Sequence, residues 1–151
     1  GDSALGANTT ATGNTGVGFS ALLANTTGDR NTALGWSAMA TNVDGDRNVA
    51  IGYGAMQTFE PANTATYNTA VGYVAGNAMT TAINNTFIGA LANALGVPGN
   101  QNTAVGSQAM YNNADVENTG IGYAALNANT SGGYNTAVGS NVMSVNTTGD
   151  W

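Results

Sequence analysis

Cysteine, histidine and lysine are absent from this 151-residue sequence, and only 7% of its residues are charged. Without cysteine no disulfide holds the fold, and the thiol nucleophiles and nitrogen bases that serve many active sites are missing. We therefore expect no enzyme activity and no cofactor. We also expect no metal site, because the turn Asp44-Gly45-Asp46 lacks the carboxylate spacing of a calcium-binding loop.

Positive charge is scarce as well, since Arg30 and Arg47 stand against eight acidic residues and leave a net charge of -6. A chain of this charge repels a phosphate backbone, so we expect no nucleic-acid partner. Long hydrophobic runs are also missing. A membrane-spanning helix needs about 18 or more consecutive apolar residues, so we expect no membrane insertion by this segment.

What the sequence has in place of these features is a repeat. The pentapeptide Asn-Thr-Ala-Val-Gly at 135–139 recurs with small changes, and one unit of about 17 residues is too small to bury a core, so units must stack on one another. We predict an all-β fold, a parallel β-roll or β-solenoid with one coil per unit. The array fills 1–151 as a single domain, with a partial unit at 1–13 and units that start at Asn14, Asn31, Asn48, Asn68, Asn85, Asn102, Asn118 and Asn135.

Both ends of the sequence fall inside a unit. Residues 1–5 correspond to residues 18–22 one period later, and Asp150-Trp151 stops at the place where Asp29-Arg30 ends an earlier unit. We therefore predict that the chain is a fragment of a longer fibre.

Two positions of the unit, counted from its Asn, keep one type of residue in every unit, and we expect both to be constrained by packing. Position 5 is always glycine, which indicates a bend or a backbone that passes too close for a side chain: Gly18, Gly35, Gly52, Gly72, Gly89, Gly106, Gly122 and Gly139. Position 4 is always branched and apolar, and we expect it to form a buried, inward-facing column: Val17, Leu34, Ile51, Val71, Ile88, Val105, Ile121 and Val138.

Positions 1 to 4 alternate as in a short strand, with Thr and the branched residue on one face and Asn and Ala on the other. After the glycine we expect a second short strand, as at 20–22 and 37–39. The rest of each unit has the composition of turns, and the most prominent turns are expected at 57–63 and 93–100, which contain the two prolines.

A coil that encloses one branched residue and one Leu or Met buries little surface per residue, so we expect association to add stability. The small side chains at Ala33 and Gly35, and again at Ala137 and Gly139, suggest a face on which three copies approach closely. We predict a homotrimer.

The repeated Asn-Thr-Ala-Val-Gly, followed three residues later by Ala-Leu or Ala-Met, resembles the head repeats of trimeric autotransporter adhesins and similar repeats of bacteriophage and phage-tail-like fibres. The resemblance covers nearly the whole chain. It implies a left-handed parallel β-roll, three chains side by side, and extracellular display on a cell surface or on a virion or tail fibre. The turns here are longer than in adhesin heads, and both the adhesin and the tail-fibre assignment stay open.

The predicted function is therefore a non-catalytic attachment fibre whose partner is a cell-surface glycan or protein receptor. Because the coils repeat the same small side chains, we expect receptor recognition by the irregular turns and by a row of aromatic residues at position 6. The row consists of Phe19, Trp36, Tyr53, Tyr73 and Tyr123. The candidate contact residues are Trp36, Tyr53, Phe59, Glu60, Tyr73 and Val97.

Ice binding by a β-solenoid is the alternative function, because a flat, evenly spaced Thr array suits an ice surface. The ordinary explanation of such an array is that Thr favours strands and that its hydroxyl bonds within the ladder. The Thr residues share a face with the branched column that we expect to be buried, which favours the fibre. The Thr column occupies position 2: Thr15, Thr32, Val49, Thr69, Thr86, Thr103, Thr119 and Thr136.

Overall fold

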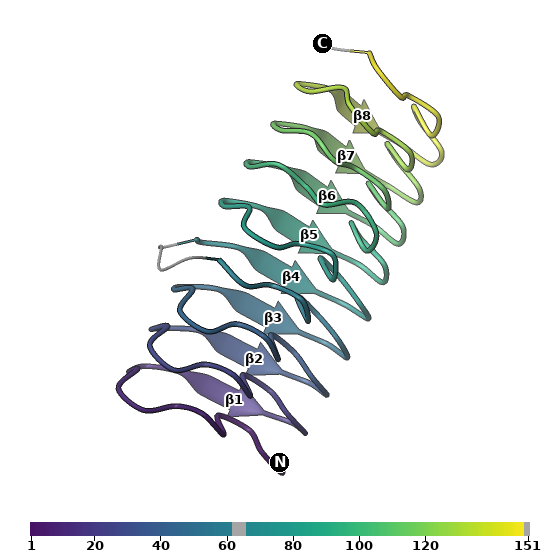
Figure 1. The fold of residues 1–151 in the computed structure, drawn as a ribbon. Helices are drawn as coiled ribbons and strands as arrows, with labels where there is room; N and C mark the ends of the chain where they lie inside the picture. Colours follow the sequence, from purple (N-terminus) through teal and green to yellow (C-terminus); the bar gives the residue numbers. More distant parts are fainter. Residues whose placement is uncertain (62–65, 150–151) are drawn as a thin grey trace.

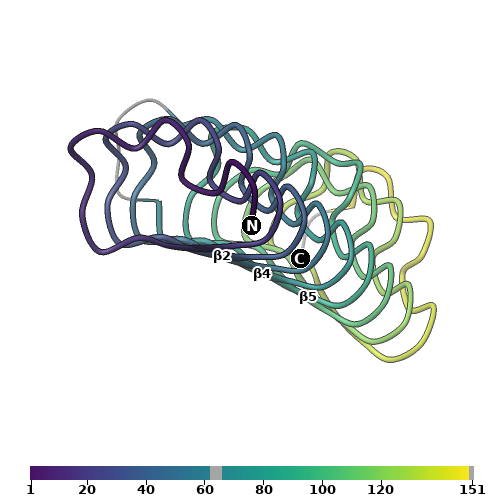
Figure 2. The same ribbon diagram turned by 90° about the horizontal axis from the view of Figure 1, so that it is seen from below.

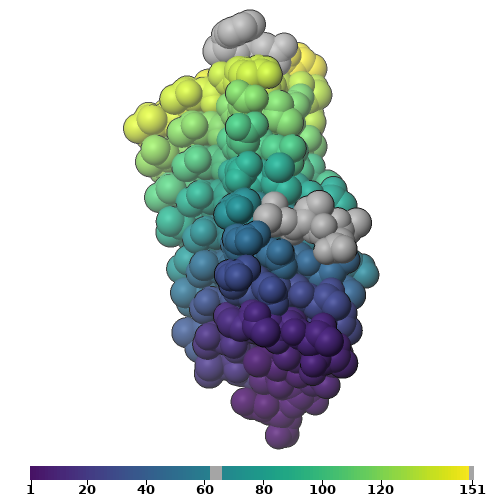
Figure 3. All heavy atoms as spheres, turned by 90° about the vertical axis from the view of Figure 1, so that its left-hand side faces the viewer, coloured from purple at the N-terminus to yellow at the C-terminus, as the bar shows by residue number. Residues whose placement is uncertain are grey.

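The computed structural model describes residues 1–61 and 66–149 and shows one elongated parallel β-solenoid, in which each repeat makes one coil (Figures 1 and 3). The predicted all-β parallel solenoid is confirmed, and the described residues contain no helix. Ala62 and Asn63 of one predicted prominent turn, and Asp150-Trp151, lie outside the described residues. The strands are β1 (Thr15–Val17), β2 (Thr32–Leu34), β3 (Val49–Ile51), β4 (Thr69–Val71), β5 (Thr86–Ile88), β6 (Thr103–Val105), β7 (Thr119–Ile121) and β8 (Thr136–Val138).

The eight strands form one parallel sheet in sequence order, along one flat side of the coils (Figure 2). Each residue pairs with the residue at the same position of the next coil, and the longer step between β3 and β4 keeps this register, so Val49 pairs with Thr69. At the strand ends, the Thr15 amide donates to the Asn31 carbonyl oxygen at 2.8 Å. This register stacks equal side chains at intervals of about 4.8 Å.

The segment after the glycine is not a second strand, so that prediction was wrong. Positions 7 and 9 adopt left-handed backbone conformations, with φ of 55° at Ser20 and 53° at Leu22. The Ser20 amide donates to Asp2 of the preceding coil, while the Leu22 amide donates to Ala38 of the following coil, each at 3.0 Å. The amides at positions 7 and 9 thus bond to opposite neighbouring coils, while the Ala21 amide between them donates to the Gly18 carbonyl oxygen of its own coil at 3.4 Å, which satisfies the backbone without a strand.

The branched column at position 4 points outward, so its predicted place in the core was also wrong. Five of its members are exposed, from 39% at Ile121 to 66% at Val138, and the other three are half-buried. The alternation itself is correct, because Thr and the branched residue share one face. That face is turned to the outside, and the Asn and Ala positions face the interior.

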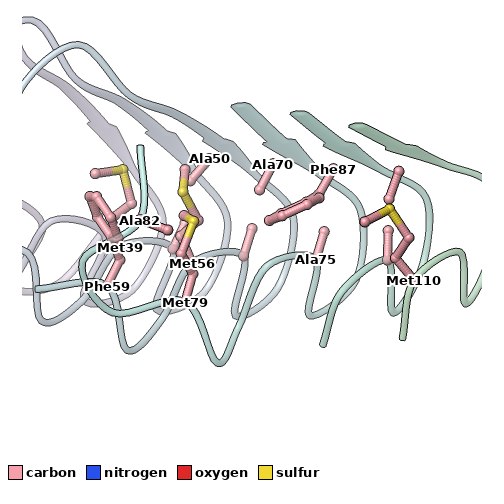
Figure 4. Packing of buried hydrophobic residues seen from close by; sticks show 14 of the residues in the cluster. Met39, Ala50, Met56, Phe59, Ala70, Ala75, Met79, Ala82, Phe87 and Met110 are labelled. Atoms are coloured by element: carbon pink, nitrogen blue, oxygen red, sulfur yellow. The ribbon is translucent and has the colours of Figure 1, made fainter. Parts of the chain in front are cut away.

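The interior is filled from the opposite side of the coil, where position 9 supplies a Leu or Met in most coils (Figure 4). A Cβ added to Gly120 at position 3 would lie 2.9 Å from Cγ of Met110, so only a small residue fits there. The interior therefore pairs small residues of the sheet with large residues of the turns. Ala33 and Ala137 are buried in this core, which rules out the predicted Ala and Gly contact face between chains.

One coil reverses this division of sizes. Position 9 is Gly76 in the fourth coil, and position 3 of the next coil is Phe87 rather than Ala. A Cβ on Gly76 would lie 3.0 Å from Cδ2 of Phe87, so the phenyl ring fills the space that a Leu or Met occupies elsewhere. The exchange keeps the core filled at constant backbone geometry.

The glycine column behaves as predicted. Its φ angles lie between +128° at Gly122 and +141° at Gly72, a region that residues with a side chain rarely adopt. A Cβ on Gly35 would lie 2.6 Å from the carbonyl carbon of Gly52 in the next coil. Position 5 is therefore glycine both because of the bend and because the next backbone lies against it.

Two columns of buried asparagine run through the interior. At position 1, the Oδ1 atom of each Asn accepts the backbone N–H of the Asn one coil later, for example Asn85 N–H to Asn68 Oδ1 at 2.9 Å. At position 12, side-chain amides bond to one another, as from Asn42 Nδ2 to Asn25 Oδ1 at 2.8 Å. Buried amides that are paired in this way satisfy their polar groups and fix the register between coils.

Candidate contact surfaces

An exposed row of aromatic rings follows the sheet at position 6, where the sequence predicts it. Ring centroids are 5.9 Å apart for Phe19 and Trp36, 4.7 Å for Trp36 and Tyr53, and 5.5 Å for Tyr53 and Tyr73, with interplanar angles of 8° to 20°. The rings stack because equal positions of successive coils are one strand spacing apart. Along this stack the row presents ring edges to the solvent, and a ring face is open only where the row is interrupted.

Of the three candidate contact residues in the irregular turns, two are accessible and one is not. Glu60 and Val97 are exposed, whereas Phe59 is fully buried, so its prediction as a contact residue was wrong. Phe59 occupies position 12, the place of the second Asn column, and therefore points into the coil. Glu60 lies at the rim of an open hollow that is also lined by Val43, Asp44 and Pro61.

The sheet face is a second candidate surface, which the sequence suggested only for ice binding, because the branched column was expected to lie inside. It carries the Thr column and the branched column side by side, and in the described residues no hydroxyl of this Thr column makes a hydrogen bond to the protein. The expected bonding of these hydroxyls within the ladder is therefore not present. The recurring Leu or Met at position 9 could have revealed this face, because it already supplies one large core residue in most coils and leaves the branched residue at position 4 for the outside.

Charged side chains gather at the other end of the strands in the first coils. The carboxylate of Asp29 accepts the backbone N–H of Thr12 at 2.6 Å, and that of Asp46 accepts the N–H of Asp29 at 2.7 Å. Arg47 lies 3.7 Å from Asp46 and places its guanidinium 5.5 Å from the centre of the Tyr67 ring. The two carboxylate bonds and the contact of Arg47 with Tyr67 join neighbouring coils, so the charges have a structural role on this edge.

The carboxylate of Asp29 predicts a pH dependence of stability. The Thr12 N–H bond is the main cause that lowers the pKa of Asp29 below its ordinary value of 3.8. A lowered folded-state pKa means that the stabilisation is present above 3.8 and is lost as the pH falls through the folded-state pKa. We expect Asp29→Asn to melt slightly below the wild type at neutral pH, with a difference that shrinks in acid, as measured by circular dichroism.

Asp2→Asn, which also removes one negative charge from an exposed position, controls for the change in net charge. If the difference between Asp29→Asn and the wild type stays constant down to the lowest pH, the hydrogen bond to Thr12 does not depend on the ionised carboxylate.

Within 1–61 and 66–149, no three His, Cys, Asp or Glu side chains come together in a way that could hold a metal ion. The same part of the chain has no helix of the length and hydropathy needed to cross a bilayer. The exposed side chains that could make contacts lie in the aromatic row, the turns and the sheet face.

Of the residues proposed from the sequence, the structure brings Trp36, Tyr53 and Tyr73 together in one stack. Glu60 and Val97 belong to separate turns, after β3 and β5 respectively. Comparison of the chain with protein-family models, with curated proteins and with solved structures found no match.

Proposed function

We propose that this chain is a segment of a non-catalytic attachment fibre, a homotrimer displayed outside the cell on a cell surface or on a virion or tail fibre. The observation that supports it best is the column of branched apolar side chains that lines the sheet face through all eight strands, five of them exposed. An apolar surface of this extent is usually covered by a partner. Another copy of the chain matches this column in length and in period.

The structure changes the face that we assign to the contact between copies. The interface is formed by the Thr and branched columns rather than by the Ala and Gly positions, because Ala33 and Ala137 lie inside the coil. The number of copies and the left-handed winding rest on the resemblance to trimeric adhesin heads and phage-type fibres. In this arrangement the sheet faces meet at the centre, and a glycan or protein receptor is bound by groups that project elsewhere.

Light scattering on the purified chain tests the assembly. We expect a mass of three times the 15.0 kDa chain at micromolar concentration. A mass of one chain at that concentration would overturn the homotrimer.

A charge at the centre of the sheet face should dissociate the trimer. Ile88 is exposed, and its neighbours in the column are Val71 and Val105. Ile88→Asp would place one carboxylate from each copy in an apolar interface, which costs several kcal/mol of association free energy. We expect light scattering to show a monomer.

Leu95→Asp is the control, because Leu95 is exposed but lies in a turn outside the sheet. It should remain trimeric. Circular dichroism should show that both variants keep the fold of the wild type, and an Ile88→Asp protein that stays trimeric would place the interface on another surface.

Ice binding remains the second candidate function, because the structure removes one argument against it. The Thr column is outward-facing and its hydroxyls are not bonded to the protein in the described residues. The two functions need the same face in opposite states, covered in a trimer and open to water in an ice-binding protein. A monomer that shows thermal hysteresis would favour ice binding, and a trimer without hysteresis would favour the fibre.

A further inference from the structure

The aromatic row is interrupted after Tyr73. Trp36 has a ring stacked on each side, and so has Tyr53, so both faces of these two rings are covered. Position 6 of the next two coils is Ala90 and then Ser107, both exposed, and the row resumes with Tyr123. The face of Tyr73 toward Ala90 and the face of Tyr123 toward Ser107 therefore have no aromatic neighbour in the row.

The two tyrosines are separated by three coil steps of about 4.8 Å, or roughly 14 Å along the rod. The described residues leave Tyr73 55% exposed and Tyr123 53% exposed. Between them, Ala90 contributes only a methyl group, and the hydroxyl of Ser107 makes no hydrogen bond within the described part of the chain. The interval thus has an open ring face toward each end and a hydroxyl that can donate or accept a hydrogen bond.

We propose that the interval at Ala90 and Ser107 binds terminal sugar residues of a neutral glycan, which stack on the open faces of Tyr73 and Tyr123. This inference rests on the proposed attachment function and names the ligand class. A pyranose ring combines an apolar face of C–H groups, which suits an aromatic face, with hydroxyls that Ser107 can bond. Because the rings stack along the rod, their open faces point along its axis. The sugar ring would therefore enter the interval from the side of the rod.

The charge of the chain favours a neutral glycan over an acidic one. The net charge is -6, and the two cations, Arg30 and Arg47, precede β2 and β3, at the opposite end of the strands from position 6. Arg47 is also engaged with Asp46 and Tyr67. An anionic sugar would therefore be repelled and would find no positive partner at this site.

Filling the interval tests the proposal without removing a ring. Ala90→Tyr and Ser107→Tyr each place at position 6 a residue that occurs there at Tyr53, Tyr73 and Tyr123, so the coils should tolerate them. Saturation-transfer NMR and titration with a panel of neutral galactose-, glucose- and N-acetylglucosamine-terminated oligosaccharides measure binding. We expect the double variant to bind the best ligand of the wild type about tenfold more weakly, since it covers the two ring faces that bound the interval.

Ser140→Tyr is the matched control, because it adds the same side chain to the same column on the other side of Tyr123, outside the interval. It should bind as the wild type does. Sialylated forms of the same oligosaccharides should bind more weakly than the neutral forms.

The proposal is overturned if no neutral oligosaccharide of the panel binds the wild type, or if the double variant binds as tightly as the wild type. Equal loss in the Ser140→Tyr variant would also overturn it, because the interval would then not be the site. A trimer that binds no glycan would leave the fibre in place and remove only this inference, whereas a glycan-binding monomer would remove the trimer and leave the site.

Discussion

Replacing Gly52 by Ala is expected to lower the free energy of unfolding by about 3 kcal/mol or more. Its φ of +133° is accessible almost only to glycine, and an added Cβ would lie against the carbonyl oxygen of Gly72 in the next coil. That neighbour is backbone and cannot rotate away as a side chain can, so the strand register between β3 and β4 would have to shift. Thermal unfolding followed by circular dichroism measures the loss.

Gly54→Ala is the matched control, two residues further along the same coil. Gly54 also has a positive φ, +62°, but a Cβ there would meet its nearest atom, Oε1 of Gln57, at an ordinary 3.5 Å. Ala124 occupies the equivalent position of another coil with a φ of 52°. We expect a cost of about 1 kcal/mol for Gly54→Ala, and equal losses in the two variants would mean that the close approach of the coils at position 5 is unimportant.

Asn113→Ala should cause the second large loss, about 3 kcal/mol. The side chain of Asn113 is fully buried, and its Oδ1 atom accepts hydrogen bonds from Asn118 Nδ2 at 3.2 Å and from Asn129 Nδ2 at 2.8 Å. Its own Nδ2 donates to the carbonyl oxygen of Asp115 at 3.0 Å. Alanine removes these bonds, leaves Nδ2 of the buried Asn118 without a partner among the described residues, and opens a cavity between two coils.

The neighbouring residue provides the control, because Asn112 is exposed and its side chain makes no hydrogen bond within the described part of the chain. Asn112→Ala should change the free energy of unfolding by no more than about 0.5 kcal/mol. Similar melting temperatures for Asn113→Ala and Asn112→Ala would show that the buried amide column contributes little to stability.

Where the Asn column at position 12 is interrupted, a buried amide oxygen loses its hydrogen-bond donor. Position 12 changes from Asn42 to Phe59 in the next coil, and Oδ1 of Asn42 accepts no hydrogen bond from the described residues. In the preceding step this oxygen's counterpart, Oδ1 of Asn25, is bonded by Asn42 itself. The middle coils therefore replace polar bonding by apolar packing of Phe59 and Met79.

The period of the sequence determined the architecture. A residue type that returns at the same position of each unit requires equal positions to stack, which gives one coil per unit, a parallel sheet in register and the face-to-face row at Trp36 and Tyr53. The glycine column was predictable for the same reason, because a side chain missing from every unit indicates a steric limit that every coil shares. These features follow from repetition alone.

Only the tertiary structure decided which side of the sheet is inside. Alternation shows that Thr69 and Val71 share a face and that Ala70 has the other, but it is symmetric with respect to inside and outside. The choice depends on volume across the coil: Met110 covers Gly120 so closely that position 3 must be small, and the branched residues are left on the exterior. Phe59 lies inside for a related reason, since its position in the coil, rather than its place in an irregular turn, sets the direction of its side chain.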